Sequence, residues 1–537
     1  MRPLISAMTS LRHVLLAALK SLLRGKSFLQ AMLAFWISPA AVTSQDGKLT
    51  PGPTRTVADF LNEAEDLLLG PVDDGLSDFA AKLKQQFRIG LRSNPACMLP
   101  SYNHQLPSGH ERGQYLALDV GGSTFRVALV ELRGKGVKGP ASTIVQMDSF
   151  RIDSRAKSLR GLEFFDWMAE RILQTISKES KRGSSPDDPL LVGMAWSFPI
   201  EQTSSKGGKL CGMGKGFYAA EGLIGRDLGE IIELACRKRN LYVELSAIVN
   251  DSSATLLSEA YLTSSTRFGL ILGTGVNIAV HLPVGTIGQP KYGDRPQSWH
   301  DKASHVIVNT ELGMFGKGIL PLTKWDYSLL DSHPRPDFQP LEHLVSGYYV
   351  GEVCRLALVE AIETTGLFGG IVPPSLLSPY SLDTETLSLI AADTDPSSSA
   401  ACKIFASRHP SVVEPDCADI AVLRTISSYI ARRSASIVAA SLVALWELKS
   451  ETEEELLNTL PADSPFAAET KAEMEIARTT VAFNGSVIEH YPGYLQCAQQ
   501  YIDDLVSTSS RVGGSIELVA ARESSLLGAA VALACLE

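Results

Sequence analysis

Apolar residues follow two kinds of pattern along the 537-residue chain. Short, nearly continuous apolar runs have the length of buried strands. They lie at 115–132, 143–152, 190–200, 244–251 and 267–282. Longer stretches space their apolar residues as helices do, and these lie at 57–91, 161–178, 224–239 and over most of the chain from 341 onward. This alternation predicts an α/β protein.

Two of the strand segments share one design. LALDVGGSTFRVALVEL (116–132) is a strand, a Gly-Gly break and a second strand, and RFGLILGTGVNIAVHL (267–282) repeats this about 150 residues later around Gly-Thr-Gly. A two-glycine break between strands is typical of a tight hairpin. Because each copy opens a stretch of alternating strands and helices, the repetition predicts a duplicated α/β core with a nucleotide between its halves.

The C-terminal part of the chain has a different pattern. Residues 447–478 are acidic, and we expect them to form a solvated surface excursion. Residues 479–494 predict a strand and a turn, and residues 514–536 predict a strand, a loop and a terminal apolar helix.

Composition excludes several classes of protein. A net charge of -10 argues against a general nucleic-acid binder, and 45% hydrophobic with 20% charged residues is ordinary for a globular protein. The 8 cysteines are scattered and form no CxxC pair, which disfavours a zinc or disulfide framework and favours a reducing compartment.

Residues 1–45 differ from the rest because they contain basic residues and no acid. Residues 11–24 predict an amphipathic helix, and 27–42 carry no charge but fall short of the roughly 20 residues of a transmembrane helix. The pattern fits a mitochondrial presequence or an interfacial anchor, and a secretory signal is the alternative. We expect the N-terminus to contact a mitochondrial membrane and the protein to lie on the cytoplasmic side of the mitochondrial outer membrane, or else in the cytosol. A polar linker follows at 46–56.

The first glycine turn carries candidate phosphate chemistry. Asp119 lies two residues before Gly121-Gly122, where successive N–H groups can form an anion nest and the carboxylate can hold a hydrated cation. An ordinary hairpin with a capping Asp is the alternative. The turn opens a strand, which excludes a GxGxxG dinucleotide loop, and the chain has no GxxxxGK[ST].

Asn250 and Asp251 end the apolar strand AIV, at the sheet edge where α/β folds bind ligands. Asp251 could take a proton from a hydroxyl, or it could cap the helix that follows, and the two roles are compatible.

Further polar residues lie in SFPIEQ (197–202), GKGF (214–217), NTELGMFG (309–316) and LEHLVSGYYVGE (341–352). They bring hydroxyl, amide and carboxylate groups and one lysine, Lys215. Such a set suits a polyhydroxylated neutral ligand, because each sugar hydroxyl needs both a donor and an acceptor. No His/Cys cluster has metal-ligand spacing.

Seven motifs occur together and in order: LALDVGGSTFRVALVEL, SFPIEQ…GKGF, VNDSSAT, LILGTGVNIA, NTELGMFG, LVSGYYVGE and FNGSV…YPGY. With them, residues 57–537 resemble a eukaryotic hexokinase of the fungal type. The resemblance implies the actin-like sugar-kinase (ribonuclease H-like) fold, with two α/β domains closing around hexose and ATP. It implies a small domain at 57–255, completed by the helix 524–537, and a large domain at 256–523.

The resemblance also implies roles for individual residues. Asp251 matches the general base that activates the sugar 6-hydroxyl for attack on the γ-phosphoryl of ATP, the first step of glycolysis, with Lys215 as a second catalytic residue. The sugar contacts match Ser197, Phe198, Lys215, Asn250, Asp251, Asn277, Glu311 and Glu342. The ATP contacts match Asp119, Gly121, Gly122, Ser123, Thr124, Arg126, Gly273, Thr274, Gly275, Gly485 and Ser486, with Asp119 orienting hydrated Mg²⁺.

The chain departs from the family pattern mainly on the nucleotide side. Gly214 stands where a sugar-bonding threonine is usual, and Asn484 where an aspartate is usual. Ser524-Ser525-Leu526-Leu527 replaces a glycine-serine-glycine-basic run near the adenosine. The first hypothesis is therefore an ATP-dependent hexokinase, and the second is a sugar-sensing, hexokinase-like regulator with weak or no catalysis. An actin-like ATPase would share the phosphate hairpins but has no need of the sugar motifs.

Overall fold

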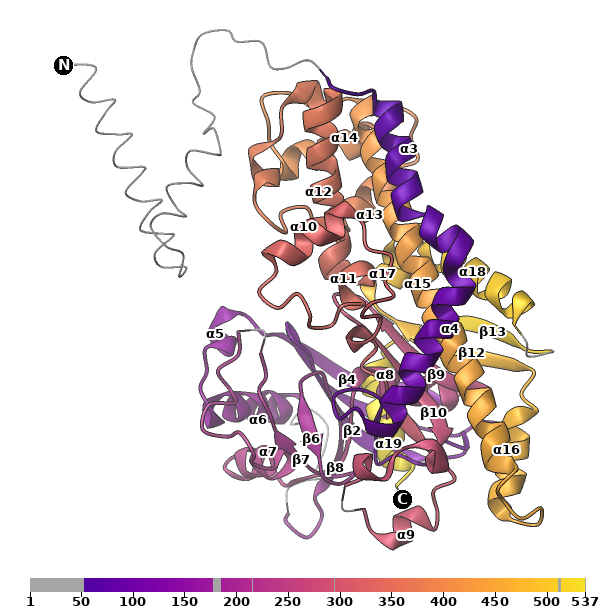
Figure 1. Cartoon of the computed structure of the whole chain (residues 1–537). Helices are drawn as coiled ribbons and strands as arrows, with labels where there is room; N and C mark the ends of the chain where they lie inside the picture. The colour runs from indigo at the N-terminus through magenta and orange to yellow at the C-terminus, as the bar shows by residue number, and fades with distance from the viewer. Residues whose placement is uncertain (1–52, 177–184, 215, 294, 510–512, 537) are drawn as a thin grey trace, which may run out of the picture. The chain divides into compact units, whose positions relative to one another are not determined.

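The computed structural model describes residues 53–176, 185–214, 216–293, 295–509 and 513–536, and residues 53–537 make one compact unit (Figure 1). The N-terminal segment 1–45 and Lys215 therefore lie outside the described residues. Two mixed sheets carry the fold, as the duplicated glycine hairpins predict.

The first sheet has five strands in the order β4-β3-β2-β5-β8. Their bounds are β2 Gly113–Val120, β3 Thr124–Leu132, β4 Ser142–Arg151, β5 Leu190–Trp196 and β8 Val243–Val249. Strands β2, β3 and β4 pair antiparallel, and β2, β5 and β8 pair parallel. Side chains of β2 alternate between two cores, since Leu116 and Leu118 pack with α6 (Leu162–Ile176) and α7 (Leu228–Arg237), whereas Ala117 packs on the opposite face.

The second sheet has six strands in the order β1-β11-β10-β9-β12-β13. Their bounds are β1 Leu99–Pro100, β9 Thr266–Leu272, β10 Val276–Pro283, β11 His305–Asn309, β12 Arg478–Asn484 and β13 Ser515–Ala520. From β11 to β13 this order repeats the first sheet: a hairpin, a third antiparallel strand on one side and two parallel strands on the other. The predicted duplication is confirmed.

Long helices cover the second sheet (Figure 1). The longest, α15 (Cys417–Leu457), packs along α4 (Gly70–Ser93) and against α12 (Gly347–Thr365) and α18 (Tyr494–Thr508). Helix α3 (Val57–Leu68) joins the same hydrophobic core, so the first two described helices pack with the second sheet rather than with the sheet that follows them in the chain. The domain boundaries implied by the resemblance stay a prediction.

Two helices connect the sheets. Helix α8 (Asp251–Ala260) contacts strands of both sheets, and α19 (Ser524–Ala534) packs on α8 and on the first sheet. Their approach is very close, because a Cβ added at Gly528 would lie 1.9 Å from the Ala254 carbonyl oxygen. Any larger residue at Gly528 would push the C-terminal helix away from α8, whose first residue is Asp251.

The remaining elements are short or lie at the periphery. They are α5 Ser154–Lys157, β6 Ile200–Gln202, β7 Gly208–Leu210, η1 Val284–Thr286, η2 Gln289–Lys291, α9 Gln297–His300, η3 Leu312–Met314, α10 Lys324–Ser332, α11 Glu342–Val345, η4 Leu367–Gly370, η5 Pro374–Leu377, α13 Thr384–Ala392, α14 Ser399–Arg408, α16 Pro465–Met474 and α17 Ser486–His490. Among the described helices, none is long and apolar enough to cross a membrane.

The acidic segment 447–478 matches its prediction only in part, because most residues from 454 to 478 are exposed whereas those before them are largely buried. Its first part continues α15, where Lys449 and Glu453 are buried and form an ion pair, and Glu473 on α16 accepts hydrogen bonds from Arg267 of β9. The expected solvated excursion is wrong for these residues. Acidic side chains can be buried here because a lysine and an arginine neutralise them, and that pairing bridges distant parts of the chain.

Candidate active site

Asp251 begins helix α8 directly after strand β8. The residue before it, Asn250, is the N-cap: its Oδ1 accepts hydrogen bonds from the Ser253 N–H (2.8 Å) and the Ser252 hydroxyl (3.1 Å). The capping role considered for Asp251 therefore belongs to Asn250. The Asp251 Oδ1 accepts a hydrogen bond from the Ser252 N–H at 2.8 Å, which fixes the carboxylate at the positive end of the helix.

A chain of hydrogen bonds leads from the second sheet to Glu311. The Asn277 amide donates to the Asn309 Oδ1 (2.8 Å), and the Asn309 amide donates to the Glu311 Oε1 (2.9 Å). Burial raises the pKa of Glu311, and the negative charge of Asp251 raises it further. Helix α8 begins at Asp251 and contacts β10 and β11, the strands that carry Asn277 and Asn309, so the fold places Asp251 and Glu311 on neighbouring segments.

Glu342 is held against the second glycine turn. Its Oε2 accepts a hydrogen bond from the Val276 N–H at 3.1 Å, and a Cβ at Gly275 would lie 2.9 Å from that oxygen. The missing side chain at Gly275 therefore leaves the space that the Glu342 carboxylate occupies. In contrast, Glu352 is bound by Arg355 in a buried ion pair and is not part of this site.

Ser197 and Phe198 follow strand β5 beside the first glycine turn. The Ser197 N–H donates to the Val120 carbonyl at 3.2 Å. Phe198 is buried, with its ring 5.2 Å from Trp196 and 5.1 Å from Phe217 between centroids. The ring of Phe198 thus packs on Phe217, which is part of the GKGF motif.

The backbone conformation at position 214 accounts for the glycine that stands there in place of the family's threonine. Its φ is +60°, in the left-handed region where glycine is free and a β-branched residue is strained. A threonine at this position would therefore need a different loop backbone.

The first glycine turn closes at the end of β2. The Gly121 N–H donates to the Thr124 carbonyl at 3.0 Å, and the Ser123 carbonyl accepts from the Ile152 N–H at 2.8 Å. Gly122 lies between these residues, so the predicted loop residues 121–124 are brought together with their backbone geometry fixed from both sides.

Asp119 and Arg126 face each other across the hairpin. The Arg126 Nε and Nη2 donate to the Asp119 Oδ2 at 2.8 and 2.6 Å, and Nη1 donates to the Glu523 Oε2 at 2.6 Å. Burial raises the pKa of the Asp119 carboxyl, while the Arg126 guanidinium opposes that rise. One guanidinium is thus shared by two carboxylates, those of Asp119 and Glu523.

The second glycine turn meets the start of α17. The Gly273 N–H donates to the Gly275 carbonyl at 3.0 Å, and the Thr274 carbonyl accepts from the Tyr348 N–H at 3.3 Å. A Cβ at Gly273 would lie 3.4 Å from the Ser486 nitrogen, and one at Gly485 would lie 2.3 Å from the Leu272 carbonyl oxygen. The predicted residues 273–275, 485 and 486 therefore form one cluster.

The altered segment 524–527 forms the first turn of α19. The Ser524 hydroxyl lies 2.9 Å from the Thr255 hydroxyl, Leu526 is fully buried in the core beneath the first sheet, and Leu527 is half-buried beside it. Glu523, just before the helix, has a φ of +49°. The two leucines thus extend a hydrophobic core at the position where the family places a glycine and a basic residue.

Sequence reasoning missed two residues of this site. Asn309 lies at the end of the apolar strand HVIVN, just as Asn250 follows the apolar run AIV. This similar position indicates a candidate ligand-binding amide. Glu523 had no such signal, because its contact with Arg126 joins residues 397 positions apart.

Comparison with known proteins decides the family. Two family models described as hexokinase match residues 69–261 and 267–535. The chain belongs to the hexokinase family. It is 29% identical over 468 residues to Hexokinase-1 of Arabidopsis thaliana, covering 85% of this chain and 87% of that protein. It is 30% identical over 508 residues to the chloroplastic Hexokinase-2 of Nicotiana tabacum, covering 92% and 90%.

Solved structures agree. A hexokinase from Schistosoma mansoni complexed with glucose superposes with a TM-score of 0.70 at 26% identity, covering 89% of this chain and 100% of that one. A second hexokinase structure gives a TM-score of 0.68 at 25% identity. The predicted actin-like sugar-kinase fold is confirmed, and the chain is a hexose phosphotransferase.

Proposed function

We propose that this hexokinase transfers the γ-phosphoryl group of ATP to the 6-hydroxyl of a glucose-like hexose, with Asp251 as the general base. The observation that carries the proposal is the chain of amide hydrogen bonds that directs Glu311, on strands that contact the helix begun by Asp251. Phosphoryl transfer depends mostly on positioning and charge stabilisation, so one base and a fixed pair of substrates suffice.

The hexose would be held by groups whose orientation is already set. Asn277 and Asn309 direct Glu311, the Val276 N–H directs Glu342, and the helix cap directs Asn250. Amide and carboxylate oxygens accept hydrogen bonds from sugar hydroxyls, and amide N–H groups donate to them. Asp251 would take the proton of the 6-hydroxyl as that oxygen attacks. Lys215, outside the described residues, keeps its predicted role as a second charged contact.

The nucleotide phosphates would lie between the two glycine turns. The described residues contain no cluster of three or more His, Cys, Asp or Glu side chains that could hold a metal ion. This suits Mg²⁺, which is commonly bound by one or two carboxylates, substrate phosphates and retained waters. Asp119 would hold it through water. When bound, the ion would neutralise charge on the phosphate oxygens.

Coupled formation of sugar 6-phosphate at millimolar ATP tests the proposal. Glucose, fructose and mannose are the substrates, and 6-deoxyglucose is the matched control because it lacks the attacking hydroxyl. We expect turnover with at least one of the three sugars and none with the control. Glucose binding without turnover would reject catalysis and favour a sugar-sensing regulator.

We also propose that residues 1–45 attach the protein to the mitochondrial outer membrane. Their support is chemical: basic residues, no acids, and two apolar segments that together give two attachment signals. A fluorescent reporter fused to residues 1–45 should label mitochondria. A diffuse cytosolic signal would reject the anchor, and secretion of the reporter would reject the reducing compartment as well.

A further inference from the structure

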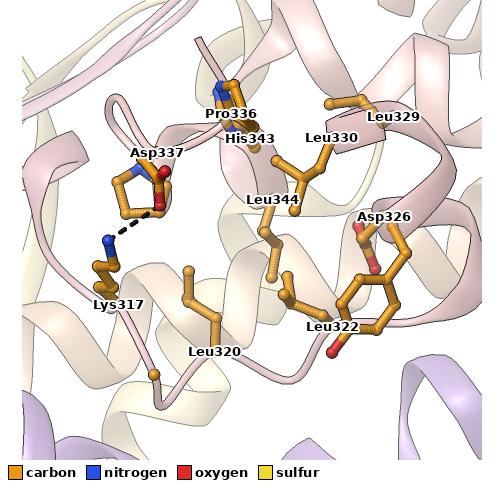
Figure 2. Close-up of a pocket in the computed structure, with 13 residues that line it drawn as sticks. Lys317, Leu320, Leu322, Asp326, Leu329, Leu330, Pro336, Asp337, His343 and Leu344 are labelled. Carbon is orange, nitrogen blue, oxygen red and sulfur yellow. Dashed lines mark hydrogen bonds and ion pairs between the residues drawn. The ribbon is translucent and has the colours of Figure 1, made fainter. Parts of the chain in front are cut away.

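A cavity of about 240 Å³ lies next to the hexose residues, between the loop after η3 and helices α10 and α11. Figure 2 shows leucine side chains converging on it from these elements. Its apolar wall is formed by Leu320, Leu322, Leu329, Leu330 and Leu344. Such a wall, with few polar groups, is typical of a small-molecule site.

His343 is the buried polar side chain of the lining that has no hydrogen-bond partner among the described residues, and Lys317, Asp326, Tyr327 and Asp337 also line the cavity. The His343 side chain is 3% exposed, and neither ring nitrogen has a hydrogen-bond partner among the described residues. The rings of His333 and Tyr349 lie 4.8 and 4.6 Å away, and burial lowers the pKa of His343 to about 4. The imidazole is therefore neutral near pH 7, with one N–H to donate and one nitrogen to accept. A buried polar group without a protein partner is rare and costly, so a hydrogen-bonding molecule in the cavity would satisfy His343.

Charges around the cavity are already balanced. At its edge, Lys317 Nζ lies 2.9 Å from Asp337 Oδ1 (Figure 2). Asp326 is held by Arg433 through two hydrogen bonds of 2.6 and 2.9 Å. A charged ligand would have no opposite charge to replace its hydration, so the lining favours a neutral molecule.

The cavity lining lies close along the chain to two residues proposed for the hexose, Glu342 and Glu311. His343 and Leu344 follow Glu342 on the single turn of α11, and the Leu341 N–H donates to the Gly313 carbonyl at 3.1 Å, two residues after Glu311. A molecule that fills the cavity would hold α11 in the position where Glu342 meets the Val276 N–H. Occupation would therefore stabilise the hexose-binding arrangement.

We propose that this cavity is a regulatory site for a small neutral molecule with an apolar ring and one hydroxyl group, and that its occupation tightens hexose binding. The binding site stands on the cavity alone, whereas the regulatory effect rests on the proposed hexokinase function.

Binding is tested on the full chain by titration calorimetry with four probes of similar size. Benzyl alcohol should bind best, because its hydroxyl can form one hydrogen bond with the imidazole, either as donor to the unprotonated nitrogen or as acceptor from the N–H. Toluene should bind more weakly, by about 2–12-fold for the lost hydrogen bond, and benzoate and benzylamine should not bind. Equal binding of all four probes, or of none, would overturn the site.

Two variants and one control locate the probe. His343→Phe keeps a ring and removes both nitrogens, so it should erase the preference for benzyl alcohol over toluene. Leu330→Phe should fill the cavity and weaken both probes at least tenfold. Leu389→Phe adds the same ring at a 40% exposed leucine on α13 and should change neither. A preference that survives His343→Phe, or probe binding that survives Leu330→Phe, would place the probe elsewhere.

The coupling between the cavity and the hexose site is the ratio of glucose affinities with and without saturating benzyl alcohol. Intrinsic fluorescence measures both affinities. We expect about a fivefold gain, at the low end of known allosteric couplings, and no gain in Leu330→Phe. Benzyl alcohol binding with unchanged glucose affinity would overturn the regulatory effect. Failure of glucose to bind at all would instead reject the proposed function, and the regulatory effect with it, while probe binding would still decide the site.

Discussion

On the side of the site proposed for the hexose (the hexose side), Asn277, Asn309 and Glu311 form a chain of amide and carboxylate hydrogen bonds. On the side proposed for ATP (the nucleotide side), Arg126 lies between two carboxylates, those of Asp119 and Glu523. The first arrangement already orients its amide and carboxylate groups. A neutral sugar could therefore bind without breaking an ion pair. The second must exchange an ion-pair partner when phosphates arrive.

The two sides also differ in how the chain builds them. Most of the residues proposed for the hexose lie at strand ends or in the turns directly after them, Glu342 lies on α11, and backbone N–H groups hold several of these side chains. The nucleotide side depends on the terminal helix α19, whose first turn adds Leu526 to a core. Substitutions should therefore affect hexose affinity and ATP affinity separately, and the catalytic step most strongly.

Replacement of Asp251 should have the largest effect. Asp251→Ala removes the proton acceptor, and we expect the phosphorylation rate to fall by about 10²–10⁴-fold. Glucose affinity should stay within about tenfold, because Glu311 and its amide chain remain. Coupled kinetics and glucose calorimetry on the same preparation measure the two quantities. Retention of most turnover would end the assignment of Asp251 as the base.

Asn309→Ala should weaken glucose binding without changing the KM for ATP. It removes the hydrogen bond that directs Glu311 and leaves Asn277 without its acceptor, so glucose affinity should fall about tenfold, in line with one lost charge-assisted hydrogen bond. The KM for ATP should not change. An equal loss for glucose and ATP would show that the hexose network also supports the nucleotide side.

The residues that the sequence proposes for the hexose lie in short, local motifs, and their assignment as sugar contacts stays a prediction. Asp251 follows an apolar strand, and the two glycine turns repeat one pattern, so local spacing was enough to propose them. The capping assignment was less certain, since Asn250 and Asp251 are both good N-cap residues and only the backbone shows that Asn250 has the role.

Other features depend on pairs far apart in the chain. The sequence predicts a surface acid at Glu473. In the fold, Arg267 and Lys449 donate hydrogen bonds to its carboxylate. Glu523 likewise accepts a hydrogen bond from Arg126, a contact that the sequence pattern does not indicate. Periodicity reports which face of an element is apolar, but it does not report which charges will meet across the fold.

Leu527→Lys tests whether the altered α19 turn weakens ATP binding. Leu527 is only half-buried, so a lysine can reach solvent there and restore the basic group that the family carries. We expect the KM for ATP to fall about fivefold, as for one electrostatic contact of about 1 kcal/mol, with glucose affinity unchanged.

Leu526→Gly is the contrasting variant in the same turn. Leu526 is fully buried, and deleting a buried leucine side chain costs about 2–5 kcal/mol, so we expect lower thermal stability with no gain in ATP affinity. Leu527→Met controls for the change of shape without charge. If Leu527→Lys and Leu527→Met give the same KM for ATP, the departure at this position does not affect nucleotide binding.

Glu523→Gln should give the smallest effect, and it tests the ion pair on which the comparison rests. Asp119, Arg126 and Glu523 together carry a net charge of -1, which repels the phosphates of ATP and occupies the Arg126 guanidinium. Removing one carboxylate should free Arg126 and lower the KM for ATP by about threefold at low salt. The Glu523 side chain is 41% exposed, so the gain should shrink as ionic strength rises. Glu221→Gln removes one charge from a surface pair with Arg160 and should leave the KM unchanged. A KM for ATP that rises in Glu523→Gln would show that Glu523 holds Arg126 in its phosphate-binding position, and the nucleotide side would then be as preorganised as the hexose side.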